Sequence, residues 1–570
     1  MAKSKSKAGA DSSARHNKAQ NTTSKSNQKS ASKQQSSTSA RHNKETSRGR
    51  DPEPRLGVHS YNDDAWYNWN PQLVIDTCNL SLMVRAGEVY DLEKNVGDQV
   101  HQVGKLNTPG IMRFTWMPSL GTWNYDDDSA AVIAFRNMYS YIRHANSGHA
   151  NYDPEDLFNY ITAIDSLYSF RAMMLRAYGA AKLYSSMNRY IGDSLLRVMG
   201  FNADDLRRNL AQFKWFINDM TTKLQTLYIP NQFAALQRHM WLNSNVFLDA
   251  ESPRAQLNVF VPKGFAVWQE GTDAETPGRF GWIDWIPNNA ELFHEATAAE
   301  CYDLFNTMWN NIIGSEDLGI INGDILKAYG SGFLIPTTIT SDWTWSPVYE
   351  PRVMLQMHNA TLCGQVAFFE DATMSAEATG IAWGYNPQIM PFASTSHING
   401  GLVKNNFLFK TEDSITHSIV MDFPNTPDPA EVMYATRLCV IGTDRKIGQE
   451  TYYEPFFSGS DVVCVATVYL LKSNTPPHDF SEGYYRHEYR TTFVDVSNYN
   501  ATVLKQTVYW NAVLDNFAMA PKITVGYGGA FVSTGDVLNI AQVDGPTLTR
   551  IHRTAMLSLY GVPMRAGGMG

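Results

Sequence analysis

Apolar residues are rare before residue 56, and beyond about residue 130 they recur with the spacing of amphipathic helices. Ser129 can cap the start of a first helix, and Gly148 is placed to end it. The apolar positions between them lie three and four residues apart: Val132, Phe135, Met138, Tyr139 and Ile142.

A second helix is predicted to begin at Asp153, which can cap it, with Pro154 in the first turn, where proline is tolerated. Its pattern continues to about Tyr184, which gives roughly 45 Å of helix at about 1.5 Å per residue. A third helix is predicted from Asn202, so this region should form an α-helical layer. The apolar positions are Leu157, Ile161, Ile164, Tyr168 and Leu175 in the second helix, and Leu206, Leu210, Phe213, Phe216 and Ile217 in the third.

From about Gln256 the helical spacing gives way to short apolar runs and turn-rich pieces, which are typical of strands and long loops. The run at 257–261 predicts a strand, and Asn399-Gly400-Gly401 predicts a turn. Helical patterns return at 291–313, at 351–360, after Asp428-Pro429, and from Pro546 to about Tyr560 with Gly561 behind it.

These patterns predict a predominantly α fold with a mixed α/β insertion. Residues 56–255 are expected to form a helical domain and residues 256–495 a mixed α/β domain. Residues 496–570 are expected to form a C-terminal segment that ends in a helix.

Residues 1–55 contain no Leu, Ile, Val, Phe, Tyr or Trp, so this arm cannot bury apolar surface and is predicted to be disordered. Residues 1–50 carry a net charge of +10, and because the whole chain carries −9, the remainder carries −19. Lys and Arg displace counterions from phosphates, so the arm is expected to hold a polyanion, with nucleic acid as the first candidate. A solubilising tail without a ligand is the alternative. The candidate RNA-binding residues are Lys3, Lys5, Lys7, Arg15, Lys18, Lys25, Lys29, Lys33, Arg41, Lys44, Arg48 and Arg50.

The rest of the chain, roughly 515 residues, is long enough for a large core. Its five cysteines are odd in number and scattered, which indicates a reducing compartment without a disulfide framework. No apolar run approaches the roughly 18 residues of a membrane span, and no apolar run follows the basic start as in a secretory signal. A soluble protein made in the cytosol is therefore expected.

Motifs for chemistry are absent from the sequence. Gly104-Lys105 lacks the upstream glycine and the hydroxyl residue of a P-loop, and His294-Glu295 and His487-Glu488 lack the second histidine of a zincin helix. No CxxC pair offers a zinc site, and Asp126-Asp127-Asp128 lacks the spacing of a calcium loop and is better interpreted as a solvated turn. No metal or cofactor is expected.

One stretch, 143–153, brings together a serine, two histidines and an aspartate. Catalytic triads gather residues from distant chain positions, whereas this stretch lies between two predicted helices and is rich in capping residues. It is therefore interpreted as a structural turn that fixes the angle between the helices through bonds to their ends. The turn residues are Arg143, His144, Asn146, Ser147, Gly148, His149, Asn151 and Asp153.

Around this turn the chain resembles the capsid proteins of picobirnaviruses. The resemblance spans most of 62–438 and is strongest at 139–170, which includes YIRHANSGHANY at 141–152 and AIDSLY at 163–168. Further similar blocks are NDDAWY at 62–67, RHMW at 238–241 with 245–246 and 254–256, SEDLGI at 315–320, GDILKA at 323–328 and ATRL at 435–438.

The resemblance implies a structural coat protein, not an enzyme, of a virus with a two-segment double-stranded RNA genome. It implies a helical shell domain (56–255), a projecting domain (256–495), a C-terminal segment returning to the shell (496–570) and a basic arm (1–55) that contacts RNA inside. The implied partners are further copies of the chain, forming homodimers within one icosahedral shell, and the viral genomic RNA, with the packaged polymerase as a further candidate. The implied location is the virion, assembled in the host cytoplasm.

One alternative is a non-assembling RNA-binding nucleoprotein, which the arm alone would permit. Another is an enzyme, although no group of residues in the sequence indicates a catalytic site. The resemblance also implies that the arm can be removed by a single self-cleavage. The candidate region is the junction at 47–55, whose prolines and glycine predict an accessible backbone. No cleavage signal is recognisable in the sequence.

Overall fold

The computed structural model divides into two units, residues 1–82 and 83–570, each of which is considered by itself. The arm at 1–55, with all twelve candidate RNA-binding residues, lies outside the described residues. The structure describes residues 66–67, 70–79, 89–96, 99–107, 109–119, 130–146, 152–183, 191–252, 255–271, 278–285, 295–361, 366–367, 388–389, 403–404, 407–408, 418–447, 450–457, 459–471, 484–489, 517–521, 523–527, 530–534 and 539–562.

The first unit contains one described helix, α2 (Pro71–Cys78). Asn70 caps it, because its side-chain oxygen accepts hydrogen bonds from the main-chain amides of Gln72 and Leu73 at 3.2 and 3.3 Å. Proline at the first position fits the same start. None of the residues of α2 is buried within the chain.

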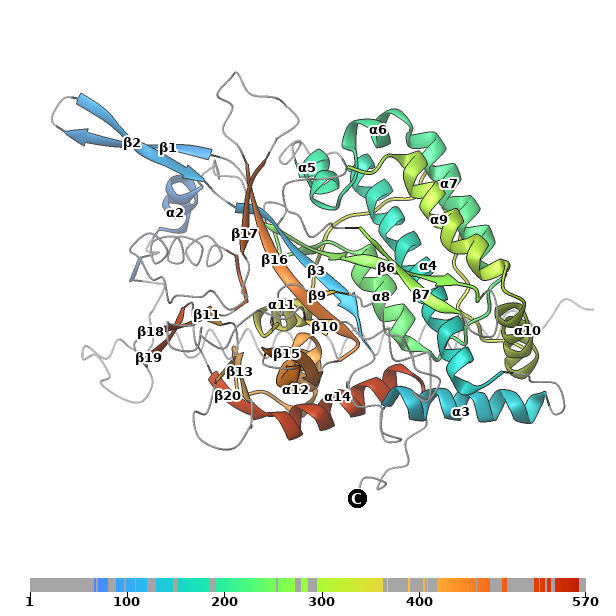
Figure 1. Ribbon diagram of the computed structural model, residues 1–570. Coiled ribbons are helices and arrows are strands. Elements are labelled where there is room, and N and C mark those ends of the chain that lie inside the picture. Colours follow the sequence, from blue (N-terminus) through green and yellow to red (C-terminus); the bar gives the residue numbers. More distant parts are fainter. Residues whose placement is uncertain are drawn as a thin grey trace, which may run out of the picture. The chain divides into compact units, whose positions relative to one another are not determined.

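The second unit is built around a six-stranded sheet with the order β17-β16-β3-β5-β4-β8 (Figure 1). β3 lies at its centre, antiparallel to β16 and parallel to β5. The strands are β3 (Pro109–Pro118), β4 (Phe247–Leu248), β5 (Leu257–Pro262), β8 (Val348–Tyr349), β16 (Asp461–Leu471) and β17 (Tyr484–Tyr489).

The sheet separates two hydrophobic cores because successive side chains of a strand point to opposite faces. Leu257, Val259 and Val261 of β5 join the larger core, whereas Phe260 joins the second. Every residue of β5 is buried, as expected for a strand covered on both faces. Burying a side chain such as Phe260 contributes roughly 1.5–3 kcal/mol, so central strands supply much of the stability.

A layer of helices covers the face of the larger core (Figure 1). The 29-residue helix α4 (Pro154–Lys182) runs through its middle and contacts α8, α7, α5 and α9. Because α4 has neighbours on all sides, nearly all its residues are buried. The other helices are α3 (Ala130–Ala145), α5 (Ile191–Val198), α6 (Ala203–Arg208), α7 (Leu210–Leu224), α8 (Ala234–Ser244), α9 (Ala298–Ile313) and α10 (Glu316–Tyr329).

On the other face, α11 (Pro351–His358) supplies Val353, Met354 and Met357 to the second core. The C-terminal helix α14 (Gly545–Leu559) returns to the helical layer, where it contacts α3 and α8. α12 (Pro429–Ala435) and the 3-10 turn η4 (Thr436–Leu438) lie beside α11.

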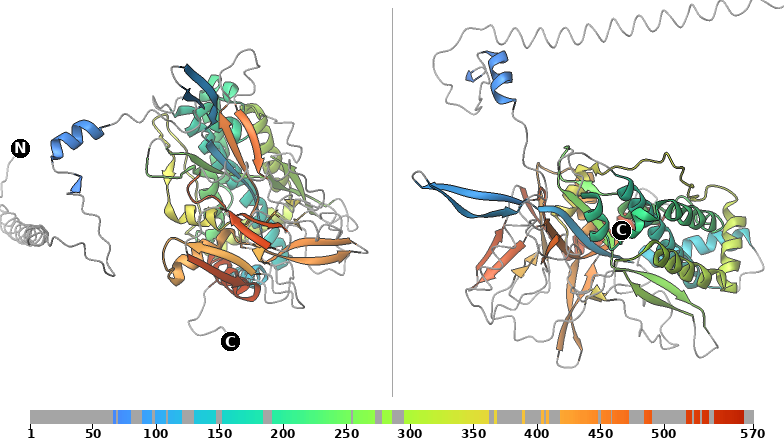
Figure 2. Two further views of the ribbon diagram at one scale, coloured as in Figure 1. Left: turned by 90° about the vertical axis from the view of Figure 1, so that its left-hand side faces the viewer. Right: turned by 90° about the horizontal axis from the view of Figure 1, so that it is seen from above.

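Smaller sheets complete the second unit, and the β14–β15 hairpin reaches away from the helical layer (Figure 2). Their strands are β1 (Val89–Val96), β2 (Gln99–Asn107), β6 (Gly264–Gln269), β7 (Arg279–Asp284), β9 (Val366–Ala367), β10 (Gln388–Ile389), β11 (Val403–Lys404), β12 (Phe407–Leu408), β13 (Ser418–Phe423), β14 (Ile441–Ile447), β15 (Glu450–Phe457), β18 (Ile523–Tyr527), β19 (Ala530–Thr534) and β20 (Asn539–Asp544).

Several sequence predictions are confirmed by these elements. The first two helices correspond to α3 and α4, and a capping box at Asp153 and Asp156 closes the first turn of α4. The predicted strand at 257–261 is β5, and α9, α11, α12 and α14 occupy the other predicted helical regions. Ser129, Gly148, 126–128 and 399–401 lie outside the described residues.

Other predictions need correction. The helical interpretation of 56–255 is wrong for residues 89–96, 99–107 and 109–118, which form β1, β2 and β3. The strand β3 is buried at the centre of the sheet, and its apolar run follows no helical period. The third helix is two helices that meet at Asn209. The expected division between residues 255 and 256 falls within the large sheet, where β5 pairs with β3 and β4.

The four described cysteines are free thiols, with Cys78 exposed and Cys301, Cys439 and Cys464 buried. Cys363 lies outside the described residues. Among the described helices, none combines the length and apolar character needed to cross a membrane.

Candidate functional site

The predicted structural turn joins α3 to α4, and half of its residues can be placed. Arg143 and His144 lie in the last turn of α3, Asn146 follows that helix, and Asp153 precedes α4. Ser147, Gly148, His149 and Asn151 lie outside the described residues. Asn146 and the neighbouring Tyr152, which is not among the predicted turn residues, form hydrogen bonds between this turn and other elements.

Asn146 connects the end of α3 to helix α10. Its buried side-chain amide donates to the carbonyl of Ile142 and to the carbonyl of Asp324, both at 3.1 Å. The carbonyl of Ile142 also accepts from the main-chain amide of Asn146 at 3.0 Å, so the side chain adds a second hydrogen bond at the end of α3. The bond to Asp324 joins two segments that are far apart in the sequence.

Tyr152 reinforces this connection from the other end of the turn. Its hydroxyl donates to the carboxylate of Asp324 at 3.1 Å, and its carbonyl accepts from the hydroxyl of Tyr139 at 2.9 Å. Burial raises the pKa of Tyr152, and the Asp324 carboxylate raises it further, so the phenol stays protonated and remains a donor. The turn thus holds α10 by two hydrogen bonds, both to Asp324.

Aromatic contacts support the same junction. The rings of Tyr139 and Tyr152 meet edge-on with centroids 5.8 Å apart, and the ring of Tyr141 lies 4.8 Å from that of Tyr329 at the end of α10. The Arg143 guanidinium lies 5.9 Å from the ring centroid of Tyr139, within the range of a cation–π contact. These are packing and positioning contacts, and they include no nucleophile paired with a base.

A second group of polar side chains is buried where the helical layer meets the sheet. The imidazole of His239 on α8 lies between two carboxylates, with Nδ1 2.7 Å from Asp165 of α4 and Nε2 3.1 Å from Asp461 of β16. The neighbouring Arg238 also binds Asp461 and donates to the side chain of Gln356. This set, Asp165, Arg238, His239 and Asp461, is called the ionic cluster below.

The electrostatics of the ionic cluster favour fixed charges. Burial alone would lower the pKa of His239, but the carboxylates of Asp165 and Asp461 outweigh it and raise this pKa to about 10. Burial would raise the pKa of Asp461, but Arg238 and His239 hold it well below its usual range. His239 is therefore an imidazolium at neutral pH, and a protonated imidazole cannot act as a general base.

Beyond the ionic cluster, Arg437 and His552 form a further buried pair of basic residues. The Nε2 atom of His552 donates to the carbonyl of Cys439 at 2.8 Å, because a carbonyl can only accept. Burial and the nearby Arg437 lower the pKa of His552 to about 3, so its ring is neutral. The role of His552 is to bind the main chain of Cys439.

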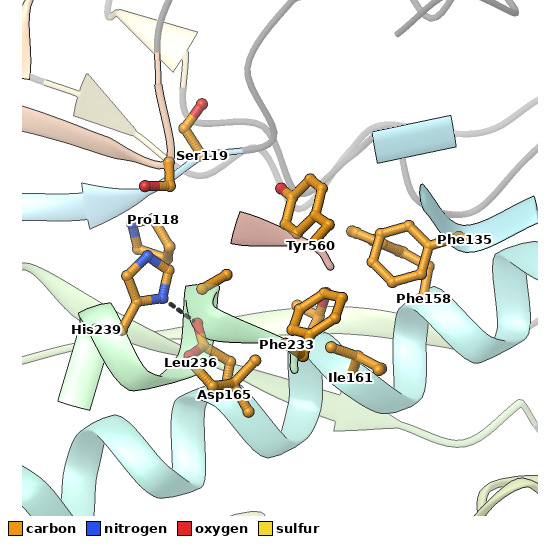
Figure 3. A pocket seen from close by; sticks show the side chains of 13 residues that line it. Pro118, Ser119, Phe135, Phe158, Ile161, Asp165, Phe233, Leu236, His239 and Tyr560 are labelled. Carbon is orange, nitrogen blue, oxygen red and sulfur yellow. Dashed lines mark hydrogen bonds and ion pairs between the residues drawn. The ribbon is translucent and has the colours of Figure 1, made fainter. Parts of the chain in front are cut away.

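A small cavity of about 30 Å³ adjoins the ionic cluster. Figure 3 shows Asp165 and His239 on one side of it and the rings of Phe135, Phe158, Phe233 and Tyr560 on the other. Such a volume holds about one water molecule, whereas ligand pockets span roughly 300–1,000 Å³. No group of three or more His, Cys, Asp or Glu residues suited to a metal is present among the described residues.

The sequence does not predict the ionic cluster, although RHMW at 238–241 belongs to the blocks that carry the resemblance. Locally, only the adjacent basic residues Arg238 and His239, in a helix that also carries apolar residues, hint at a buried ionic group. Asp165 and Asp461 lie 296 positions apart in the numbering and come together only through the fold.

The fold and these two sites define a structural protein, with polar groups used to join elements. The chain belongs to the picobirnavirus capsid protein family, because the model of that family matches residues 66–386, which is more than half of the 570 residues. The resemblance noted in the sequence is therefore confirmed. Members of this family are viral capsid proteins, which have a structural and non-enzymatic role, associate with copies of themselves and are located in the virion.

Two relatives agree with this assignment. The chain is 27% identical over 545 residues to a capsid protein precursor of human picobirnavirus (strain Human/Thailand/Hy005102/-), covering 91% of this chain and 95% of the relative. It also matches an X-ray structure of the picobirnavirus capsid with a TM-score of 0.66 and 19% identity, covering 87% of this chain and 98% of that one. The second likeness concerns the fold, which combines helices and strands as in that capsid.

Proposed function

We propose that this capsid protein assembles from homodimers into a closed icosahedral shell around a double-stranded RNA genome, with its basic arm contacting the RNA without sequence preference. The observation that carries the proposal is the division of charge in a member of a capsid family: +10 in residues 1–50 and −19 in the remainder. An acidic body does not retain RNA by itself, whereas twelve Lys and Arg side chains on an arm can neutralise phosphates.

The same division of charge suggests how the genome is held. A wall that repels phosphates leaves the RNA mobile inside the particle, and tethered arms supply the attraction. Mobile RNA can be transcribed inside the particle, so a packaged polymerase is a further candidate partner. Assembly is proposed to take place in the host cytoplasm.

The packing of the helices supports a modified division into domains. We propose that the helical layer, drawn from residues 130–244 and 298–329, forms the shell wall. The contacts of α9 and α10 with α3, α4 and α7 favour this assignment, although both lie beyond the boundary expected at residue 255. The contacts of α14 with α3 and α8 support a C-terminal segment that returns to the shell, and the small sheets of 403–457 and 523–544 are candidates for the projecting part.

Electron microscopy of the purified full chain tests the assembly. Closed, uniform particles are expected, whereas soluble RNA-bound oligomers without a shell would favour the non-assembling nucleoprotein. Monomers that bind no RNA at any concentration would contradict both functions.

Deletion of residues 1–50 tests the role of the arm. Particles of the deletion variant are expected to form but to lose RNA, which lowers the ratio of absorbance at 260 and 280 nm. A matched variant in which the twelve arm Lys and Arg residues are replaced by Gln keeps the length of the arm and should lose RNA equally. Retention of RNA at the wild-type ratio by either variant would contradict the proposed role.

A further inference from the structure

Helix α10 has one face that packs into the core and an opposite face that is exposed. Its buried residues are Leu318, Ile321 and Ile325, which pack into the larger core. At about 100° per residue, Gly323 lies almost opposite these three, at the middle of the outward face. The exposed positions of this face are Glu316, Gly319, Ile320, Gly323, Leu326, Lys327 and, just after the helix, Gly330.

This outward face carries apolar side chains around open space. Ile320 and Leu326 are each 39% exposed. A Cβ atom added at Gly319 or Gly323 would meet no heavy atom of the described residues within 4 Å. Glycine within a helix costs roughly 1 kcal/mol relative to alanine, and packing among the described residues gives no reason for it here. A second backbone approaching closely would give such a reason.

Both exposed positions three residues from Gly323 are apolar, Ile320 before it and Leu326 after it. Counting outward from it, Ile320 corresponds to Leu326, Gly319 to Lys327, and Glu316 to Gly330. An antiparallel copy of α10, related by a two-fold axis at Gly323, would therefore set Ile320 against Leu326 of the partner twice. Both apolar side chains would then be covered by apolar side chains of the partner, as a two-fold interface can achieve with one surface.

The charges favour the antiparallel orientation. Glu316 and Asp317 lie in the first turn of α10, and Lys327 lies in the last. Antiparallel packing brings each acidic end near the Lys327 of the other copy and opposes the two helix dipoles, whereas parallel packing would place acid beside acid.

We propose that α10 is a dimer contact, in which it packs antiparallel against α10 of a second copy of this chain with Gly323 on the two-fold axis. This inference rests on the self-assembly proposed above and identifies one surface that carries it. A pair of single helices is smaller than the roughly 1,600 Å² of a standard interface, so neighbouring segments contribute as well. Tyr141, which is 51% exposed and lies against Tyr329, is placed to extend the contact.

In this contact, the hydrogen bonds from the α3–α4 turn to α10 hold the contact helix in place. Asn146 and Tyr152 bind Asp324, which follows Gly323 directly, so the turn fixes the segment at the proposed axis. A rigid contact helix loses little conformational freedom on association.

Cysteine cross-linking tests the contact directly. In a Cys78→Ser background, which removes an exposed thiol, Gly323→Cys places two thiols beside the two-fold axis, where a Cα separation below about 7 Å permits a disulfide. Mild oxidation of assembled particles should give covalent dimers. Asp303→Cys, at an exposed position of the adjacent α9, is the matched control and should give none.

Charge exchange provides a test that introduces no side chain at the axis. Glu316→Lys and Lys327→Glu should each weaken the dimer by roughly tenfold, because two ion pairs per dimer become repulsive. The double variant should restore the wild-type dissociation constant. Asp303→Lys, a charge reversal on α9, should leave it unchanged.

A third variant separates assembly from folding. Gly323→Leu should leave the thermal unfolding temperature of the isolated chain unchanged or raised, since leucine favours the helix and meets no neighbour there. The same variant should fail to form dimers and particles. Particles that assemble from wild-type chain, with no cross-link at residue 323 and no rescue by the double charge exchange, would overturn this contact while leaving the proposed shell function intact. Wild-type chain that never assembles would instead refute the shell function.

Discussion

Single side chains join distant elements of this capsid protein. The side-chain amide of Asn146 donates both to the carbonyl of Ile142 in α3 and to that of Asp324 in α10. His239 connects α4, α8 and β16 through two carboxylates. In both cases a buried polar group has partners on different elements. Removal of His239 would also leave the carboxylates of Asp165 and Asp461 without their shared partner, which costs more than the bonds themselves contribute.

Asn146→Ala is expected to lower the stability of the second unit by about 1–3 kcal/mol, because it removes two side-chain hydrogen bonds, to the carbonyls of Ile142 and Asp324, that contribute about 0.5–1.5 kcal/mol each. His144→Ala, two residues away and exposed, is the control and should change stability by less than about 0.5 kcal/mol. Thermal unfolding of the two variants measures the difference. Equal unfolding temperatures would show that the turn does not depend on Asn146.

His239→Gln is expected to cost about 3–5 kcal/mol near neutral pH, because it leaves the carboxylates of Asp165 and Asp461 without their shared cation. The folded pKa of His239, about 10, lies above its ordinary value of 6.5. Its contribution is therefore complete below about pH 6.5 and is lost as the pH rises through about 10.

Denaturation of wild-type protein and of His239→Gln between pH 6 and pH 10 tests the sign. The stability difference between them should shrink as the pH rises. A constant difference over this range would mean that His239 does not carry its charge in the folded state.

At the scale of elements, the long helix α4 acts as the centre of the helical layer. Its fully buried Arg176 donates from Nη1 to three carbonyls: Leu242 and Asn245 at the end of α8, and Phe260 in β5. Burial lowers the pKa of Arg176 to about 9, so the side chain remains charged at neutral pH. One guanidinium thus holds α4, α8 and the sheet together.

Arg176→Met keeps most of the apolar stem but removes every donor, and it is expected to destabilise the second unit by roughly 3–5 kcal/mol. Lys182→Met, at the exposed end of the same helix, removes a cation of lesser burial and should cost below about 1 kcal/mol. Urea denaturation of both variants provides the comparison. A loss of stability at residue 182 equal to that at residue 176 would contradict the central role of Arg176.

At the scale of the whole molecule, the junction at 47–55 is the candidate region for the self-cleavage that the family resemblance raises. The sequence at 47–55 holds two prolines and a glycine, a composition typical of linkers that are open to cleavage. If the arm is cleaved there, assembled particles will accumulate a fragment that begins between about Arg50 and Trp66. Intact-mass analysis after prolonged incubation decides it, since a single species at 64.0 kDa would exclude efficient cleavage.

Much of the local structure could be predicted from the sequence. The start of α4 follows from Asp153 and Pro154, and the helical face of α3 follows from apolar spacing, because caps and periodicity depend on neighbouring residues. The break at Asn209 and the strand β3 escaped prediction. The burial of β3 on both faces removes the polar alternation by which a half-buried strand is recognised.

By itself the sequence determined the helices around the turn, the division of charge between arm and body, and the family, since all three depend on residues close together in the chain. The tertiary structure alone decided the central sheet, in which β3 pairs with β5 and β16, and the meeting of Asp165, His239 and Asp461. Strand pairing and buried charge depend on contacts between distant residues, and their free energy comes from burial and partners that no local pattern specifies.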